Sequence, residues 1–281
     1  MTRPSHRPAR AADGRATRPP AVAGRFYPAD PEVLAALVDG LLDAVRVPAE
    51  DSLASAYVVP HAGYDYSGPT AAQVYARLRR HAGEVRRVVL LGPAHLVRLE
   101  GCAAPGAAGW LTPLGELPVD DGAVRALAHD GHLVVDDAPH APEHSLEVQL
   151  PFLQRALPAG TPVLPIVVGP SSVDDVVITL AAVAEAGTVV LCSTDLSHYQ
   201  PAALADTQDA RTAQAVLELA AERIGMRDAC GVFALRGTVA WARHTGLRPS
   251  LLARCTSATA TGDESRVVGY AAFAFAAPLA T

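Results

Sequence analysis

The chain has 281 residues, half of them hydrophobic, and a formal net charge of −6 with a pI near 5.9. This composition excludes a largely disordered chain, and the acidic charge argues against a nucleic-acid-binding surface. No apolar run approaches the roughly 18–20 residues that span a bilayer, and the first residues lack the order of a secretory signal, so we expect a cytoplasmic protein that does not act on membranes.

Lysine is absent from the sequence, which excludes a mechanism that forms a Schiff base on a lysine. The four cysteines include no C-x-x-C pair and so predict neither a disulfide framework nor a zinc ribbon: Cys102, Cys192, Cys230 and Cys255. The simplest interpretation of each is a small buried apolar side chain.

Residues 1–20 are rich in arginine, proline and alanine and show no periodicity, which predicts a disordered basic tail. An RNA-binding arm is the alternative, but a run this short is more often simply solvated. No linker-like stretch follows the tail. Residues 21–281 are therefore predicted to form a single domain.

The ordered part begins with an amphipathic helix, because Asp30 is a good N-cap, Pro31 suits the first turn, and apolar residues then recur at helical spacing. The patterns that follow alternate between short apolar runs and helical periodicity. In chain order they predict a strand ending at Val59, a helix over Pro69–Arg80, a strand over Val85–Leu91, a hairpin or irregular excursion in "WLTPLGELPVD", a helix over Asp121–His129 and a strand over His132–Val135.

The second half continues this alternation with "EHSLEVQLPFLQRAL", a predicted helix that Pro151 kinks or breaks. Strands that are apolar throughout and alternate with helices are typical of a largely parallel sheet covered on both faces. We predict an α/β fold, a three-layer α/β/α sandwich. Its remaining elements are a strand over Thr161–Val168, a capped helix from "SSVDD" to Gly187, the strand of "TVVLCSTDLSH", helices over Asp206–Ala221 and Val232–His244, and strands over Ser250–Ser257 and Arg266–Phe275.

Three predicted strands end in loops that carry chemically active side chains. His61 lies in "PHAGY", His95 in "GPAH", and Asp195 and His198 in "STDLSH". Ligands bind beyond the carboxyl ends of the strands in open α/β sheets, so these loops are expected to converge. Histidine is a common metal ligand and the usual acid or base near neutral pH. The pattern predicts one shared site at this edge.

A fourth polar group, "PHAPEHSLE", lies just before or inside a helix and contains His140, Glu143, His144 and Glu147. A single loop histidine is more often structural than a ligand, so the hypothesis depends on the repeated position at strand ends. Glu147 either supports the site or belongs to a solvated helix face, and His140 is either a site residue or merely near it. Asp195 either orients a histidine through its ring N–H, while His198 moves protons, or only caps backbone amides.

Eight sequence blocks occur in an order that resembles the Memo family, whose bacterial and archaeal members are called AmmeMemoRadiSam system protein B. The match runs from about Pro20 to Phe275, and eight ordered blocks are far more specific than one short motif. The blocks are "PAVAGRFYP", "PHAGYDYSGPTAA", "LGPAH", "TPLGELPVD", "EHSLEVQLPFLQ", "STDLSHY", "CG" and "VVGYAAFAF".

The resemblance implies a fold similar to that of the type III extradiol dioxygenases, whose active site holds a non-haem iron. Matched motif by motif, it implies three metal ligands, which are His61, His95 and Cys230. It also places Asp195 and His144 in the pocket and makes His198 the candidate acid/base. In the dioxygenases the third ligand is a carboxylate, and a thiolate in its place softens the site toward copper(I), zinc or a redox-sensitive iron.

Together these observations predict a metal-dependent redox enzyme or oxygenase that acts on a small-molecule substrate, with iron(II) or copper as the metal and zinc less favoured. In this hypothesis His198 is the catalytic base, and Asp195 and His144 orient and polarise. The alternative is a non-catalytic metal-binding or scaffold protein that works with an AMMECR-type protein and a radical SAM protein. A zinc-dependent hydrolase ranks third, because an open Cys/His site permits it but nothing selects a scissile bond.

Overall fold

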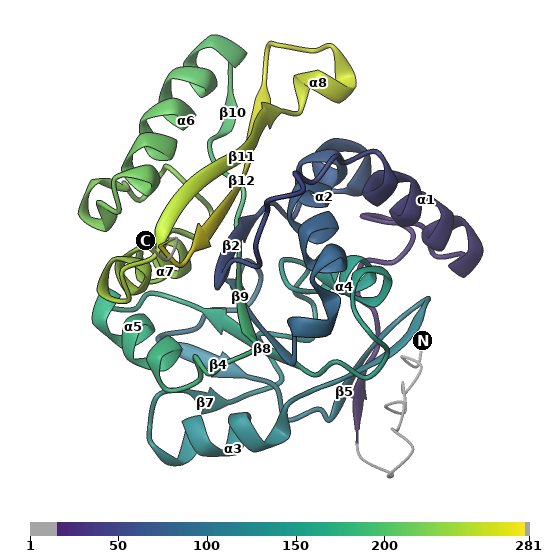
Figure 1. Ribbon diagram of the computed structural model, residues 1–281, viewed down its shortest axis with the longest axis vertical. Helices are drawn as coiled ribbons and strands as arrows, with labels where there is room; N and C mark the ends of the chain where they lie inside the picture. The colour runs from purple at the N-terminus through teal and green to yellow at the C-terminus, as the bar shows by residue number, and fades with distance from the viewer. Residues whose placement is uncertain (1–15, 279–281) are drawn as a thin grey trace, which may run out of the picture.

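The computed structural model describes residues 16–278, which form a mixed sheet of nine strands with helices on both faces (Figure 1). The strand order is β10-β12-β2-β9-β3-β8-β4-β7, and β11 pairs with β12. Four adjacent central strands run parallel, which are β2 (Ala56–Val59), β9 (Thr188–Ser193), β3 (Arg87–Pro93) and β8 (Val163–Val168). This buried parallel centre between two helical layers confirms the predicted α/β sandwich.

The strands outside this centre are mostly antiparallel, so the sheet as a whole is mixed. At one side, β12 (Val267–Ala276) pairs antiparallel with β2, β11 (Arg248–Thr256) and β10 (His198–Gln200). At the other, β4 (Cys102–Ala104) is antiparallel to β8 and parallel to β7 (Val134–Val135). Apolar strand patterns predict burial but not direction, which depends on how the connecting segments cross the sheet.

The helices form two layers that cover the sheet (Figure 1). Helices α1 (Pro31–Asp43), α2 (Tyr64–Arg80) and α4 (Leu150–Ala156) pack together on one face. Helices α5 (Val173–Ala181), α6 (Ala202–Leu217) and α7 (Val232–His244) cover the other, while α3 (Asp121–His129) lies beside β7 and α8 (Ala258–Thr261) connects β11 to β12. Within residues 16–278, no helix is both long and apolar enough to cross a membrane.

Several helix ends follow directly from local sequence chemistry. The Asp30 side chain accepts hydrogen bonds from the backbone N–H groups of Glu32 and Val33 at the start of α1. Helix α5 begins with a capping box between Ser172 and Asp175. The bounds of α3 and α7 agree with the prediction, because both helices combine apolar periodicity with clear start and stop residues.

Four helix predictions were wrong at their ends. Helix α5 ends at Ala181, six residues before the predicted stop at Gly187. Helix α2 begins at Tyr64, five residues before the predicted start at Pro69, so the proline lies in its second turn and leaves the Asp65 carbonyl without its usual helical donor. Helix α6 begins at Ala202 and ends at Leu217, four residues before the predicted span at both ends. The predicted helix in "EHSLEVQLPFLQRAL" is a 3-10 turn over Glu147–Gln149 followed by α4, with Pro151 in the first turn of α4.

Part of the expected tail is a strand. Residues 1–15 lie outside the described part of the chain, but β1 (Thr17–Arg18) pairs parallel with β5 (Gly109–Thr112). Strand β5 forms the predicted hairpin with β6 (Gly115–Pro118). The Arg18 side chain is only 5% exposed. The boundary at residue 20 was therefore too late, because composition alone did not show that Arg18 has a buried acceptor.

Candidate metal centre

The parallel register brings the three polar loops to one edge of the sheet. Val59 pairs with Ser193 between β2 and β9, and Leu91 pairs with Cys192 between β3 and β9. His61, His95 and Asp195 therefore leave neighbouring strands at nearly the same level. This confirms the expectation that the loops converge.

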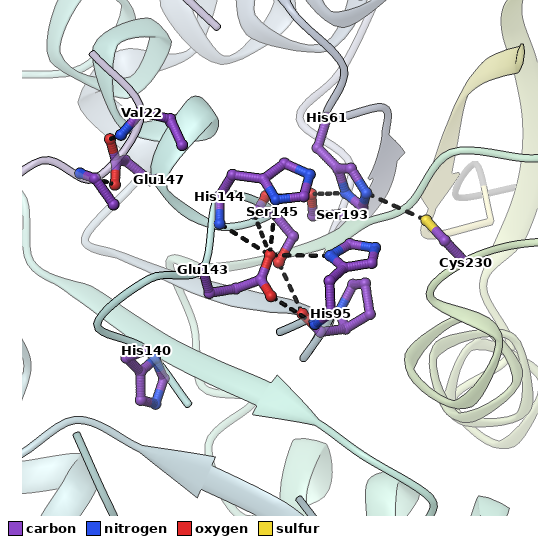
Figure 2. A network of polar contacts seen from close by, with 12 residues as sticks. Val22, His61, His95, His140, Glu143, His144, Ser145, Glu147, Ser193 and Cys230 are labelled. Carbon is purple, nitrogen blue, oxygen red and sulfur yellow. Dashed lines mark hydrogen bonds and ion pairs between the residues drawn. The ribbon is translucent and has the colours of Figure 1, made fainter. Parts of the chain in front are cut away.

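His61, His95 and Cys230 form the cluster at this edge (Figure 2). Each offers one ligand atom, and these three atoms lie within 4.8 Å of one another. The Cys230 Sγ is 3.2 Å from the His61 Nε2, although the two residues are 169 positions apart in the sequence. Two imidazoles and a sulfur at this spacing are a suitable donor set for a transition metal.

Cys230 is brought to the cluster by the turn before α7. Its backbone N–H donates to the Asp195 carbonyl, and the Gly231 N–H donates to the Thr194 hydroxyl. A Cβ on Gly231 would lie 3.0 Å from the Thr194 side chain, so a larger residue would push this turn away from β9. The tight packing of glycine on Thr194 therefore holds the thiol beside His61.

His61 is held in one tautomer by Ser193. The Ser193 hydroxyl donates to the Ser145 carbonyl, so its oxygen accepts from the Nδ1–H of His61 at 2.9 Å. This leaves the Nε2 lone pair free on the side of Cys230. Burial, reinforced by the nearby imidazoles of His95 and His144, holds the pKa of His61 well below its usual value. The ring is therefore neutral, as a metal ligand must be.

Glu143 holds His95 in the same way, and the sequence patterns did not assign it this role. Its carboxylate accepts from the backbone N–H and the Nδ1–H of His95, at 2.6 and 2.9 Å (Figure 2). Burial alone would raise the pKa of Glu143, but hydrogen bonds from His144, His95 and Ser145 outweigh it and hold the pKa well below its ordinary value. An ionised carboxylate on Nδ1 leaves the His95 Nε2 available for a metal. The signal in the sequence that could have indicated this role of Glu143 is its position directly before His144 in "EHS".

His144 lies beside the cluster, as the resemblance implied. Its ring stacks on that of His95 with centroids 4.7 Å apart, and its Nδ1 is 3.2 Å from the Glu143 carboxylate. His95, Glu143 and His144 form a second group whose ligand atoms also lie within 4.8 Å of one another. Phe26 packs on the outer side of His144, with ring centroids 4.6 Å apart. His144 is therefore placed to contact whatever binds next to His95.

Asp195 and His198 both line the cleft at the centre. The Asp195 carboxylate accepts from the backbone N–H of His61 at 2.7 Å, so the ring-orienting interpretation was wrong and the amide-capping one is correct. Burial raises the pKa of Asp195 to about 6. The His198 Nδ1 lies 2.8 Å from the Leu196 carbonyl, which can only accept, so a neutral His198 carries its lone pair on Nε2.

The cleft has a volume of about 1150 Å³ and is open to solvent. Its lining combines the predicted site residues with aromatic and amide side chains. They are Arg25, Phe26, His61, Ala62, Gly63, Tyr66, His95, His144, Asp195, His198, Tyr199, Gln200, Gln208, Met226, Arg227, Ala229, Cys230, Val268 and Tyr270. Such a space accommodates a small organic molecule beside the metal ligands.

Glu147 and His140 lie outside the ligand cluster (Figure 2). Glu147 is fully buried and pairs with Arg18 at 2.7 Å, so the solvated-face interpretation was wrong. The same guanidinium donates to the His140 and Glu143 carbonyls and lies over the Trp110 ring. Through these hydrogen bonds Arg18 stabilises the loop that carries Glu143. His140 is a buried residue whose Nε2 lies 3.1 Å from the Ala103 carbonyl.

The cysteines divide as the motif match implied. Cys102 and Cys192 are buried in the core, and Cys255 on β11 contacts the Thr70 hydroxyl. Only Cys230 lies in the described histidine cluster. Burial and the charge of Asp195 raise the pKa of the Cys230 thiol well above its usual value when no cation is bound. Without a positive charge beside it, this thiol is therefore protonated near neutral pH.

Comparison with known proteins shows the family of this chain. The family model described as Memo-like protein matches residues 18–274. MEMO1 family proteins are similar to the chain over nearly their whole length: 34% identical in Methanopyrus kandleri (92% of this chain, 98% of the relative), 35% in Ignicoccus hospitalis (93% and 99%) and 37% in Methanosarcina barkeri (91% and 98%). The matched range contains every residue of the ligand cluster. The chain therefore belongs to the Memo family.

Proposed function

We propose that this protein binds an iron(II) or copper ion through His61, His95 and Cys230 and uses it in a redox reaction on a small molecule. The observation that carries the proposal is the convergence of the three ligand atoms in an open cleft. Three protein ligands leave further positions of a transition metal open to other molecules, which is the arrangement of catalytic rather than structural sites.

The residues present fit such a metal. Ser193 and Glu143 occupy the Nδ1 atoms of His61 and His95, so both rings have Nε2 free to coordinate. A carboxylate behind a ligating histidine is a common arrangement at metal sites and raises the basicity of the ligand. The thiolate adds negative charge and softness, which favours copper or iron over magnesium or calcium.

When bound, such a metal supplies one-electron chemistry at the cleft. The chain's own residues would bind and orient the substrate and move its protons. In this proposal His198 accepts a proton from the substrate through Nε2, because its Nδ1–H is engaged by the Leu196 carbonyl. His144, whose ring lies between those of His95 and Phe26, would position and polarise the substrate.

Metal content by elemental mass spectrometry, on protein purified without oxygen, tests the proposal. We expect near-stoichiometric iron or copper in the wild type, loss of that metal in Cys230→Ala, and retention in Cys255→Ala, a matched cysteine outside the cluster. Electron paramagnetic resonance before and after chemical oxidation should show a metal that changes oxidation state. Zinc alone, equal metal in both cysteine variants, or no metal after anaerobic reconstitution would each refute the redox proposal, and the last would favour the non-catalytic alternative.

A further inference from the structure

Two segments of the cleft lining each place an arginine next to an apolar side chain. Arg25 and Phe26 belong to the segment before α1, and the Phe26 ring packs on His144. Met226 and Arg227 belong to the turn that leads to Cys230, whose Sγ contacts His61. Two of the segments that line the cleft around the ligand cluster therefore each carry an arginine beside an apolar side chain.

Within the part of the chain that the structure describes, these two arginines have no acidic partner. Many arginines of this fold pair with carboxylates, as Arg77 does with Asp51 and Arg87 with Asp120. Over the described residues 16–278, neither Arg25 nor Arg227 has a side-chain hydrogen bond or ion pair.

The cleft is therefore more positive than the rest of the molecule. Among its lining residues within the described part of the chain, the one acid is Asp195, which is only 4% exposed. A further guanidinium, that of Arg266, lies 4.6 Å from the centre of the Tyr199 ring at the same cleft. In a chain of net charge −6, this is a local reversal of sign. A cleft lined by one sign of charge concentrates ligands of the opposite sign.

We infer that the substrate of this site is an organic anion, of which a carboxylate on an apolar frame is the simplest form. Arg25 and Arg227 would hold its charged group, because a guanidinium fork matches the two oxygens of a carboxylate. Phe26, Tyr66 and Met226 would contact its apolar frame. The volume of about 1150 Å³ exceeds what one aromatic ring fills, which favours a molecule of at least two rings or an equivalent chain. This inference names the substrate class of the proposed redox site and rests on that proposal.

The test compares two probes with the same ring system, the anionic 2-naphthoate and the neutral 2-naphthalenemethanol, by isothermal titration calorimetry. Measurements on metal-free protein exclude direct ligation of the carboxylate to a metal. We expect naphthoate to bind more tightly than the alcohol, with an affinity that falls as salt is raised. Arg25→Gln and Arg227→Gln should each weaken naphthoate about three- to tenfold, as expected for partly exposed charge-assisted contacts, and leave the alcohol unchanged.

Arg248→Gln is the matched control, since Arg248 is an exposed arginine on β11 and lines no part of this cleft. It should bind both probes as the wild type does. Equal affinity for the two probes, or naphthoate binding unchanged in both cleft variants, would overturn the inference. The two proposals fail separately. If naphthoate binding depends on the arginines but the protein takes up no metal, the anion site stands and the proposed redox function fails. If the protein binds stoichiometric iron but shows no preference between the probes, the metal site stands and the anion inference fails.

Discussion

Replacing Glu143 by glutamine should damage the metal centre while changing no proposed ligand. One carboxylate oxygen accepts from the His95 Nδ1–H and from the backbone N–H groups of His144 and Ser145, and the other accepts from the His95 backbone N–H at 2.6 Å. A glutamine can place its carbonyl oxygen where it accepts from the His95 ring and the two backbone N–H groups. Its NH₂ group then faces the backbone N–H of His95, so two donors oppose each other. We expect a loss of about 2–4 kcal/mol in the free energy of unfolding, because one hydrogen bond is lost and three lose their charge.

Metal affinity should fall about 10- to 100-fold in the same variant, since the His95 ring loses the carboxylate that orients it and raises its basicity. Competition titration with a chelator measures the affinity, and urea denaturation of metal-free protein measures stability. Glu147→Gln is the matched control: it is equally buried and accepts four hydrogen bonds, none from a proposed ligand. It should lose stability but keep metal affinity within about threefold. If Glu143→Gln binds metal as the wild type does, Glu143 does not tune His95 and the reasoning is refuted.

Arg18→Met should cost about 3–5 kcal/mol in urea denaturation because it leaves Glu147 buried and unpaired, and adding Glu147→Gln should recover part of that loss; additive losses would contradict the buried pair. Metal binding at pH 8 should release about one proton from the wild type, because the Cys230 thiol is protonated without metal and the histidines are already neutral at this pH. Calorimetry in buffers of different ionisation enthalpy measures this, and metal binding without proton release would place the thiol outside the coordination sphere. Burial lowers the pKa of His140 to about 3, so the unfolded chain binds the proton first on acidification and stability falls as the pH drops below about 6.5. Between pH 7 and 5 this histidine should account for about 2 kcal/mol, and a His140→Gln variant with the same pH slope as wild type would show that it does not.

Much of the local structure of this chain follows from short-range chemistry. The start of α1 depends on Asp30 and two following amides, and α5 depends on the Ser172–Asp175 capping box. The placement of His61 and His95 after buried strands was likewise predictable, because apolar runs that end in proline or glycine mark where strands leave a sheet. The parallel centre then required these loops to meet.

The roles of the supporting residues were decided only by the tertiary structure. Glu143 and Glu147 look alike in sequence, four positions apart, yet one binds the backbone and ring of His95 and the other binds Arg18. For Asp195 the sequence left a contact with a histidine ring and an amide cap as alternatives, and the structure shows that it caps the His61 amide. Each outcome depends on partners dozens to more than a hundred positions away, which no local periodicity encodes.

The sequence alone therefore determined which histidines and acids follow the buried strands and, through eight ordered blocks, the family. The tertiary structure decided which of those residues touch. The reason is physical: hydrophobic periodicity and capping act over a few residues, whereas a ligand cluster depends on the register of strands and the packing of turns. The contact between Cys230 and His61, across 169 positions, exists because β2 pairs with β9 and Gly231 packs on Thr194.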